Sequence, residues 1–164
     1  VLRRAVLRRA TVDDLDAIDA VVREAYRKYV DRIGREPAPM DADYAALLES
    51  ATVWVLSTPD GVHGVLVTHV MSDHLFVETV AVTSAVQGRG YGAMLLAQAE
   101  LDAHHAGLDE IRLYTNVAMT ENLTFYPKHG YVETHRGRED GYDRVYFAKS
   151  VAPQSDQSPG QGPP

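Results

Sequence analysis

Three glycines within five residues form the segment of this 164-residue chain with the clearest capacity for chemistry. Gly88, Gly90 and Gly92 follow a β-favouring run and precede a run with helical periodicity. A glycine-rich bend between a strand and a helix directs backbone N–H groups and the positive end of the helix dipole at one place. Arg89 lies within the bend and can add a charge-assisted contact to phosphate. The spacing predicts an anion site, with a plain tight turn as the alternative.

Three phosphate-binding loop patterns compete for this bend. A Walker A loop needs a lysine directly after its last glycine, and none follows here. The dinucleotide pattern G-x-G-x-x-A is matched formally by Gly88, Gly90 and Ala93. That pattern wants an acidic residue at the end of the next strand, and only 72 residues follow Gly92. The third pattern, Q-x-x-G-x-G, is matched by Gln87, Gly90 and Gly92.

One carboxylate also stands out on the strand before the bend. Glu78 interrupts the apolar run LFVETVAV, where an unpaired carboxylate would be costly to bury. Strand alternation predicts that Glu78 shares a face with Val80 and Val82. The residue is a candidate general base, and a paired structural glutamate or an edge position is the alternative.

Hydrophobic periodicity predicts the elements that would position these groups. The predicted strands are 6–9, 52–57, 62–70, 74–82, 110–116, 131–136 and 142–149. The predicted helices are 12–32, 41–49, 90–106 and 122–129. Short turns make the three middle strands an antiparallel meander, and the helical connection makes 110–116 parallel to 74–82.

The resulting order, β-α-α-β-β-β-α-β-α-β-β, predicts an α/β (α+β) fold with a mixed sheet and helices on both faces. We expect one domain over residues 1–150. The segment 151–164 lacks apolar anchors, and we expect it to be a disordered tail.

Composition excludes several classes of function. The net charge of −7 and the lack of a basic stripe argue against nucleic-acid and membrane-surface binding. No apolar run approaches the ~20 residues of a membrane span, so we expect a cytoplasmic protein. The chain has no cysteine, and its seven histidines lack ligand spacing, so we expect no metal cofactor.

The loop pattern resembles that of the GCN5-related N-acetyltransferases (GNAT family). The resemblance extends to the T-x-x-D opening of the first helix, to the meander, and to the segment LTFYPKHGYVET at 123–134. It covers residues 5–149. The resemblance implies a GNAT-like acyl-CoA N-acyltransferase fold whose strands 74–82 and 110–116 splay apart like a V.

Acetyl-CoA is the co-substrate that this resemblance implies. Its pantetheine arm would bond to the backbone in the V, and its pyrophosphate would lie on the glycine loop. The residues implied to contact it are Val80, Ala81, Val82, Gln87, Gly88, Arg89, Gly90, Tyr91, Gly92 and Ala93.

The family's proton-donating tyrosine corresponds to Tyr126, ahead of the Gly130-Tyr131 pair. A core tyrosine is the alternative. The family's asparagine, seven residues before the tyrosine, is Met119 here, so a contact to CoA would come from Asn122 or be absent. The resemblance fixes no base, and Glu78 or a water chain stays open.

The acceptor site is expected at the first helix and its exit loop. Tyr26 and Tyr29, three residues apart, can line a pocket with Met40, and a place in the core is the alternative reading. The implied reaction is direct attack of a primary amine on the thioester, without a covalent enzyme intermediate. The acceptor would be a small-molecule or peptide amine.

A CoA-binding sensor or interaction module without turnover is the alternative function. A homodimer is left open beside a monomer.

Overall fold

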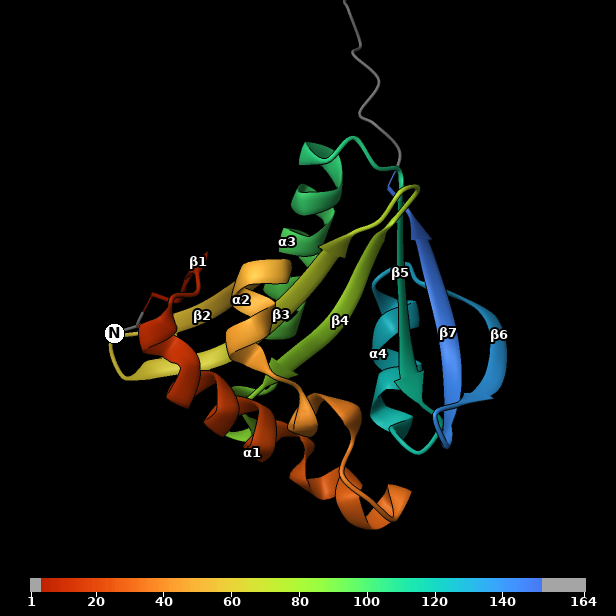
Figure 1. Cartoon of the computed structure of the whole chain (residues 1–164), viewed down its shortest axis with the longest axis horizontal. Coiled ribbons are helices and arrows are strands. Elements are labelled where there is room, and N and C mark those ends of the chain that lie inside the picture. Colours follow the sequence, from red (N-terminus) through yellow and green to blue (C-terminus); the bar gives the residue numbers. More distant parts are fainter. Residues whose placement is uncertain (1–3, 152–164) are drawn as a thin grey trace, which may run out of the picture.

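The computed structural model describes residues 4–151. Within this range one mixed sheet has seven strands in the order β1-β2-β3-β4-β5-β7-β6, and helices cover both of its faces (Figure 1). The strands are β1 (Val6–Arg9), β2 (Thr52–Thr58), β3 (Gly61–Val70), β4 (Leu75–Val82), β5 (Glu110–Asn116), β6 (Val132–Glu139) and β7 (Tyr142–Ser150). The helices are α1 (Leu15–Ile33), α2 (Tyr44–Ser50), α3 (Tyr91–His105) and α4 (Thr120–Lys128). The fold class and the order of elements predicted from the sequence are confirmed.

Two cores lie on opposite faces of the sheet because residues along the strands alternate. Val55 and Val65 face α1 and α2, whereas Leu56 and Leu66 face α3. All four of these side chains are fully buried. The core on the α3 face continues under β5 and β7 to α4, but no helix covers the opposite face of those two strands in the described part of the chain (Figure 1).

Local hydrogen bonds move several helix ends away from the predicted positions. A 3₁₀ turn, Val12–Asp14, precedes α1, and Gly34 ends that helix in the left-handed conformation with φ 86°. Helix α2 begins only at Tyr44, because the Asp43 carboxylate accepts the N–H of Ala46 at 3.1 Å and caps it.

The final hairpin is longer than predicted. Its turn is Asp140-Gly141, with φ of 54° and 79°, instead of a loop over 137–141. This is the Asp-Gly pairing that two-residue hairpin turns favour. Val151, assigned to the tail by the sequence, packs in the core, and its N–H donates to the Asp109 carbonyl at 2.8 Å. The rest of the predicted tail lies outside the described residues.

Candidate active site

The two central strands β4 and β5 run parallel but pair at only two positions. Leu75 pairs with Ile111 and Phe76 with Arg112. Past these pairs the strands diverge, as Figure 1 shows. The V-shaped separation that the family resemblance implied is therefore present.

The glycine loop lies at the wide end of this V. Gly88 and Gly90 have φ of 82° and 81°, a region that other residues rarely adopt, and Gly90 directly precedes the first turn of α3. At Gly92 a Cβ would lie 2.9 Å from Cζ of Phe125, so a larger residue there would require the Phe125 ring to shift. All three glycines thus have a conformational or packing reason to be glycine.

A cavity of about 430 Å³, here called the glycine-loop cavity, lies between this loop, α1 and α4. Tyr29, expected at the acceptor site, lines it instead, together with Lys28 and Phe125. Arg89 is exposed and is not among the lining residues. The residues expected to contact the co-substrate that do line it are Val80, Ala81, Val82, Gln87, Gly88, Gly90, Tyr91, Gly92, Ala93 and Asn122.

A second cavity, of about 210 Å³, lies between the exit loop of α1, β4, β5 and β7. We call it the proline-loop cavity, because Pro37 and Pro39 line one side. It includes Glu78. The residues that line both cavities are Tyr26, Val80, Asn122 and Tyr126. The two cavities therefore meet between α1, β4 and α4.

A β-bulge places Glu78 in the proline-loop cavity. Val67 pairs with Thr79 and Thr68 with Val77, so Glu78 is the extra residue of β4. Bulges of this kind redirect a side chain. The prediction that Glu78 shares a face with Val80 and Val82 is wrong, because the bulge shifts the alternation and both valines pack toward the α3 core.

The two oxygens of the Glu78 carboxylate differ in their hydrogen bonding. Its Oε1 lies 3.1 Å from Nε2 of His69, whereas its Oε2 is buried and has no hydrogen-bond partner within residues 4–151. An unpaired buried carboxylate oxygen is costly in a structural role. It is available to accept a proton from a bound ligand.

Tyr126 lies at the junction of the two cavities. It packs edge-on against Tyr131 and is 7% exposed. Burial is the main cause that raises the pKa of its phenol above the ordinary value of 10.0. The phenol is therefore protonated at neutral pH, as a proton donor must be.

Two residues of this site, Arg144 and Tyr114, were not identified as site residues from the sequence. Arg144, on β7, lines the proline-loop cavity, is 7% exposed, and holds its guanidinium carbon 4.1 Å from the centre of the Tyr114 ring. Its acidic neighbours are Glu139 at 3.1 Å and Asp140 at 3.8 Å, both largely exposed at the rim. The sequence feature that could have indicated Arg144 is its charge within the predicted strand YDRVYFAK.

The remaining predicted residues have structural contacts. The Tyr26 hydroxyl donates to the Val80 carbonyl at 3.0 Å, and the Asn122 amide donates to the Thr115 hydroxyl at 3.0 Å. Met40 is buried in the core under α1 and lines neither of the two cavities.

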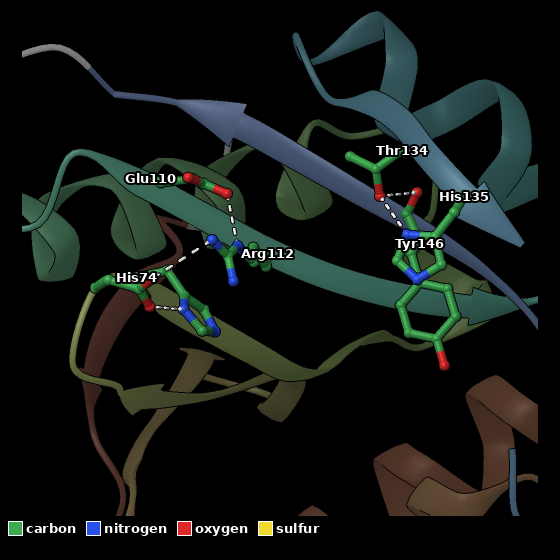
Figure 2. Close-up of polar contacts among 7 residues, drawn as sticks. His74, Glu110, Arg112, Thr134, His135 and Tyr146 are labelled. Atoms are coloured by element: carbon green, nitrogen blue, oxygen red, sulfur yellow. Dashed lines mark hydrogen bonds and ion pairs between the residues drawn. The ribbon is translucent and has the colours of Figure 1, made fainter. Parts of the chain in front are cut away.

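A third cavity, of about 510 Å³, lies on the face of β5 and β7 that no helix covers. Its polar groups are paired with protein groups: Arg112 donates to Glu110 (Figure 2), at 2.6 Å, and Nδ1 of His74 lies 2.6 Å from Oδ1 of Asp73. His135 stacks on Tyr146, with ring centres 4.2 Å apart. The charged and aromatic groups of this cavity therefore already have partners within the described residues.

No group of acidic or histidine side chains within 4–151 is close enough to hold a metal ion. No helix in the same range is long and apolar enough to cross a membrane.

The splayed strands, the glycine loop and the paired cavities match the arrangement that the family resemblance implied. The model of the acetyltransferase (GNAT) domain matches residues 49–133. The aminoalkylphosphonate N-acetyltransferase of Salmonella typhimurium is 30% identical over 137 residues, which cover 79% of this chain and 86% of the relative. The chain belongs to the GNAT family, as the sequence predicted, and is an acetyl-CoA-dependent acyltransferase.

Solved structures share the fold at low sequence identity. The PaiA N-acetyltransferase of Thermoplasma acidophilum, in complex with coenzyme A, has a TM-score of 0.76 at 16% identity, over 90% of this chain and 99% of that chain. The ribosomal-protein-S18-alanine N-acetyltransferase of Escherichia coli has a TM-score of 0.74 at 17% identity, over 94% of this chain and 98% of that chain.

Proposed function

We propose that the protein transfers the acetyl group of acetyl-CoA to a primary amine by direct attack in a ternary complex. The carrying observation is that two cavities meet at Tyr126 and Val80, with Glu78 in one and the glycine loop in the other. Such a junction brings two substrates together without a covalent enzyme intermediate. The absence of cysteine from the chain agrees with direct attack.

The glycine-loop cavity is the proposed site of acetyl-CoA. Successive N–H groups from Gln87 to Ala93, at the start of α3, suit the pyrophosphate. β5 does not pair with β4 at Val80 and Val82, and the Tyr26 and Gln87 side chains donate to their carbonyls instead. The amide groups of the pantetheine arm would replace these two donors and add to the sheet as an extended strand does.

Glu78 and Tyr126 are proposed to handle the two protons of the reaction. The acceptor amine must lose a proton before it attacks, and the buried Oε2 of Glu78 can accept it. The CoA sulfur must leave as a thiol, and the protonated phenol of Tyr126 can supply the proton.

The acceptor is proposed to be a small amine with an anionic group at its other end. Glu78 and Arg144 place opposite charges in one cavity, which Tyr114 also lines. Arginine suits carboxylate and phosphonate oxygens through paired N–H donors. The Salmonella relative is named for aminoalkylphosphonates, which carry this combination of charges.

A thermal unfolding series is the first test of this function. Acetyl-CoA at 100 times its dissociation constant should stabilise the protein by about 2.7 kcal/mol, with ADP and NAD as controls. Release of CoA thiol should then follow addition of 2-aminoethylphosphonate or β-alanine. Stabilisation without turnover on any amine would favour the alternative, a silent CoA-binding module. No stabilisation would contradict both functions.

A further inference from the structure

The Tyr26 hydroxyl lies where the two cavities meet, and the proposed reaction does not yet use it. Tyr26, on α1, lines both cavities and is 8% exposed. Its hydroxyl donates to the Val80 carbonyl at 3.0 Å, on the part of β4 that does not pair with β5. Gln87 makes the equivalent contact with the Val82 carbonyl at 3.2 Å, but Gln87 is exposed. A bound ligand would therefore affect the two donors differently.

Pantetheine bound along β4 would take over both of these carbonyls. The displaced Gln87 amide is exposed and can donate to water instead. The displaced Tyr26 hydroxyl stays inside the protein, where a donor without a partner is costly. We therefore expect the bound ligand to supply a new acceptor for the Tyr26 hydroxyl.

The acetyl thioester is the part of the co-substrate that reaches the junction, because the amine attacks it there. Its carbonyl oxygen accepts hydrogen bonds and has no hydrogen to donate. The other polar side chains that line both cavities are already used as donors. The Asn122 amide donates to the Thr115 hydroxyl at 3.0 Å, and Tyr126 is the proposed donor to sulfur. The thioester oxygen is thus the acceptor available to Tyr26.

The Tyr26 phenol keeps its proton under reaction conditions. Burial first, and then the neighbouring Tyr126 phenol, raise the pKa of Tyr26 well above the ordinary value of 10.0. Helices α1 and α4 therefore bring two protonated phenols to the junction. A thioester under attack has two atoms that gain negative charge, the carbonyl oxygen and the sulfur, so each phenol has an atom to serve.

We propose that Tyr26 is a further catalytic residue, which donates a hydrogen bond to the thioester carbonyl oxygen of bound acetyl-CoA; this inference rests on the proposed function. As the amine nitrogen bonds to the carbonyl carbon, one electron pair of the C=O bond moves onto oxygen. The Tyr26 hydroxyl stabilises this oxyanion and retains its own proton.

The rest of the step leaves Tyr26 unchanged. The electron pair returns from oxygen to re-form the C=O bond, and the C–S bond breaks. Tyr126 gives its proton to the leaving sulfur and takes back the proton that the new amide nitrogen sheds. Glu78, which took the first proton of the ammonium group, returns it to water when the products leave.

Infrared spectroscopy of bound acetyl-CoA tests the contact directly. The difference between spectra with unlabelled and ¹³C-labelled acetyl carbonyl isolates the thioester C=O stretch. A hydrogen bond to the oxygen lowers this frequency, so we expect a lower frequency in the wild type than in Tyr26→Phe. Tyr29→Phe is the matched control, because Tyr29 is on the same helix but lines only the glycine-loop cavity. Its frequency should equal that of the wild type.

Equal frequencies in the wild type and Tyr26→Phe would overturn the inference, because the hydroxyl would then remain on the Val80 carbonyl.

Kinetics and affinity separate catalysis from support of the fold. We expect kcat with 2-aminoethylphosphonate to fall about 100-fold in Tyr26→Phe. The dissociation constant of CoA, which has no acetyl carbonyl, should not rise, because pantetheine then displaces no hydroxyl. An unchanged kcat would overturn the catalytic role. A fall in kcat matched by an equal loss of CoA affinity would also overturn it, in favour of a structural role.

The infrared comparison needs no amine and so distinguishes this inference from the proposed function. A frequency that depends on Tyr26, in a protein that acetylates no amine, would support the contact and contradict the proposed transfer. Turnover with equal frequencies in the wild type and Tyr26→Phe would support the transfer and overturn the contact.

Discussion

The two cavities that meet at Tyr126 are built from different parts of the chain. The glycine-loop cavity combines one continuous stretch, from β4 through the loop at 83–90 to the start of α3, with residues of α1 and α4. The proline-loop cavity has no comparable stretch: its lining comes from α1 and its exit loop, β4, β5, α4 and β7, which are far apart in sequence.

We infer from this difference that the glycine-loop cavity recognises acetyl-CoA and that the proline-loop cavity selects the amine. The backbone N–H groups of the glycine loop suit one kind of ligand group, and few substitutions are possible at its glycines without strain. A cavity of side chains can exchange its charges while the sheet stays the same. We therefore expect variants of the glycine-loop cavity to alter acetyl-CoA affinity, and variants of the proline-loop cavity to alter turnover and the choice of amine.

The largest effect is expected from Glu78→Gln. Removal of the proposed base should lower kcat by about 100-fold or more, most strongly at low pH, where the amine is protonated. The thermal shift with acetyl-CoA should stay as in the wild type. Glu110→Gln, on the third cavity, is the matched control. A pH–rate profile that is unchanged in Glu78→Gln would remove Glu78 from the mechanism.

Tyr126→Phe tests the junction of the cavities, with an expected fall in kcat of about 30-fold. Because burial raises the pKa of Tyr126 above 10.0, its phenol keeps its proton as pH rises through neutrality. The wild-type rate should therefore show no alkaline loss from Tyr126 below about pH 10. Tyr131→Phe removes a neighbouring buried hydroxyl and should leave kcat unchanged. Equal rates for Tyr126→Phe and Tyr131→Phe would contradict the assignment.

Arg144→Gln tests selectivity. Loss of a charge-assisted contact should raise KM for 2-aminoethylphosphonate about tenfold. KM for propylamine, which has no anionic group, should not change. Arg112→Gln is the control for loss of a positive charge on the same strands. Equal increases for the two amines would mean that Arg144 supports the cavity without contacting an anion.

Gly92→Ala has the smallest expected effect and acts on the other cavity. The added Cβ would lie 2.9 Å from Cζ of Phe125, so the Phe125 ring, which lines the glycine-loop cavity, must shift. We expect KM for acetyl-CoA to rise about fivefold and the amine preference to stay the same. Gly107→Ala, at the far end of α3, should leave KM for acetyl-CoA unaltered. A change in amine preference in Gly92→Ala would erase the distinction between the cavities.

The sequence predicted the glycine-loop cavity far better than the proline-loop cavity. Gly88, Gly90 and Gly92 follow one another along the chain, and their geometry is local, so spacing alone could reveal them. Arg144 joins Glu78 only through the pairing of β7 with β5, which no local pattern encodes. Arg144 and Tyr114 were therefore missed, and Met40 was placed in a pocket although it packs in the core.

The face of Glu78 shows a second limit of strand periodicity. Alternation is a reliable guide only while every residue takes part in the ladder. One extra residue between Val77 and Thr79 reversed the direction of all that follows, and no glycine or proline marked the bulge. Glu78 was identified because a carboxylate is unusual within an apolar strand, although the face of the strand on which it lies was predicted wrongly.

The fork between β4 and β5 also bears on how the protein behaves in storage. A sheet usually has two outer edges, whereas here two more rows of unpaired backbone groups open inside it. An extended segment of another molecule, whether a second copy of this protein or a protease, can pair with such rows. We expect preparations stripped of acetyl-CoA to self-associate and to be nicked sooner than preparations that retain it. Bound acetyl-CoA would then protect the folded protein from association and cleavage, in addition to its part in the reaction.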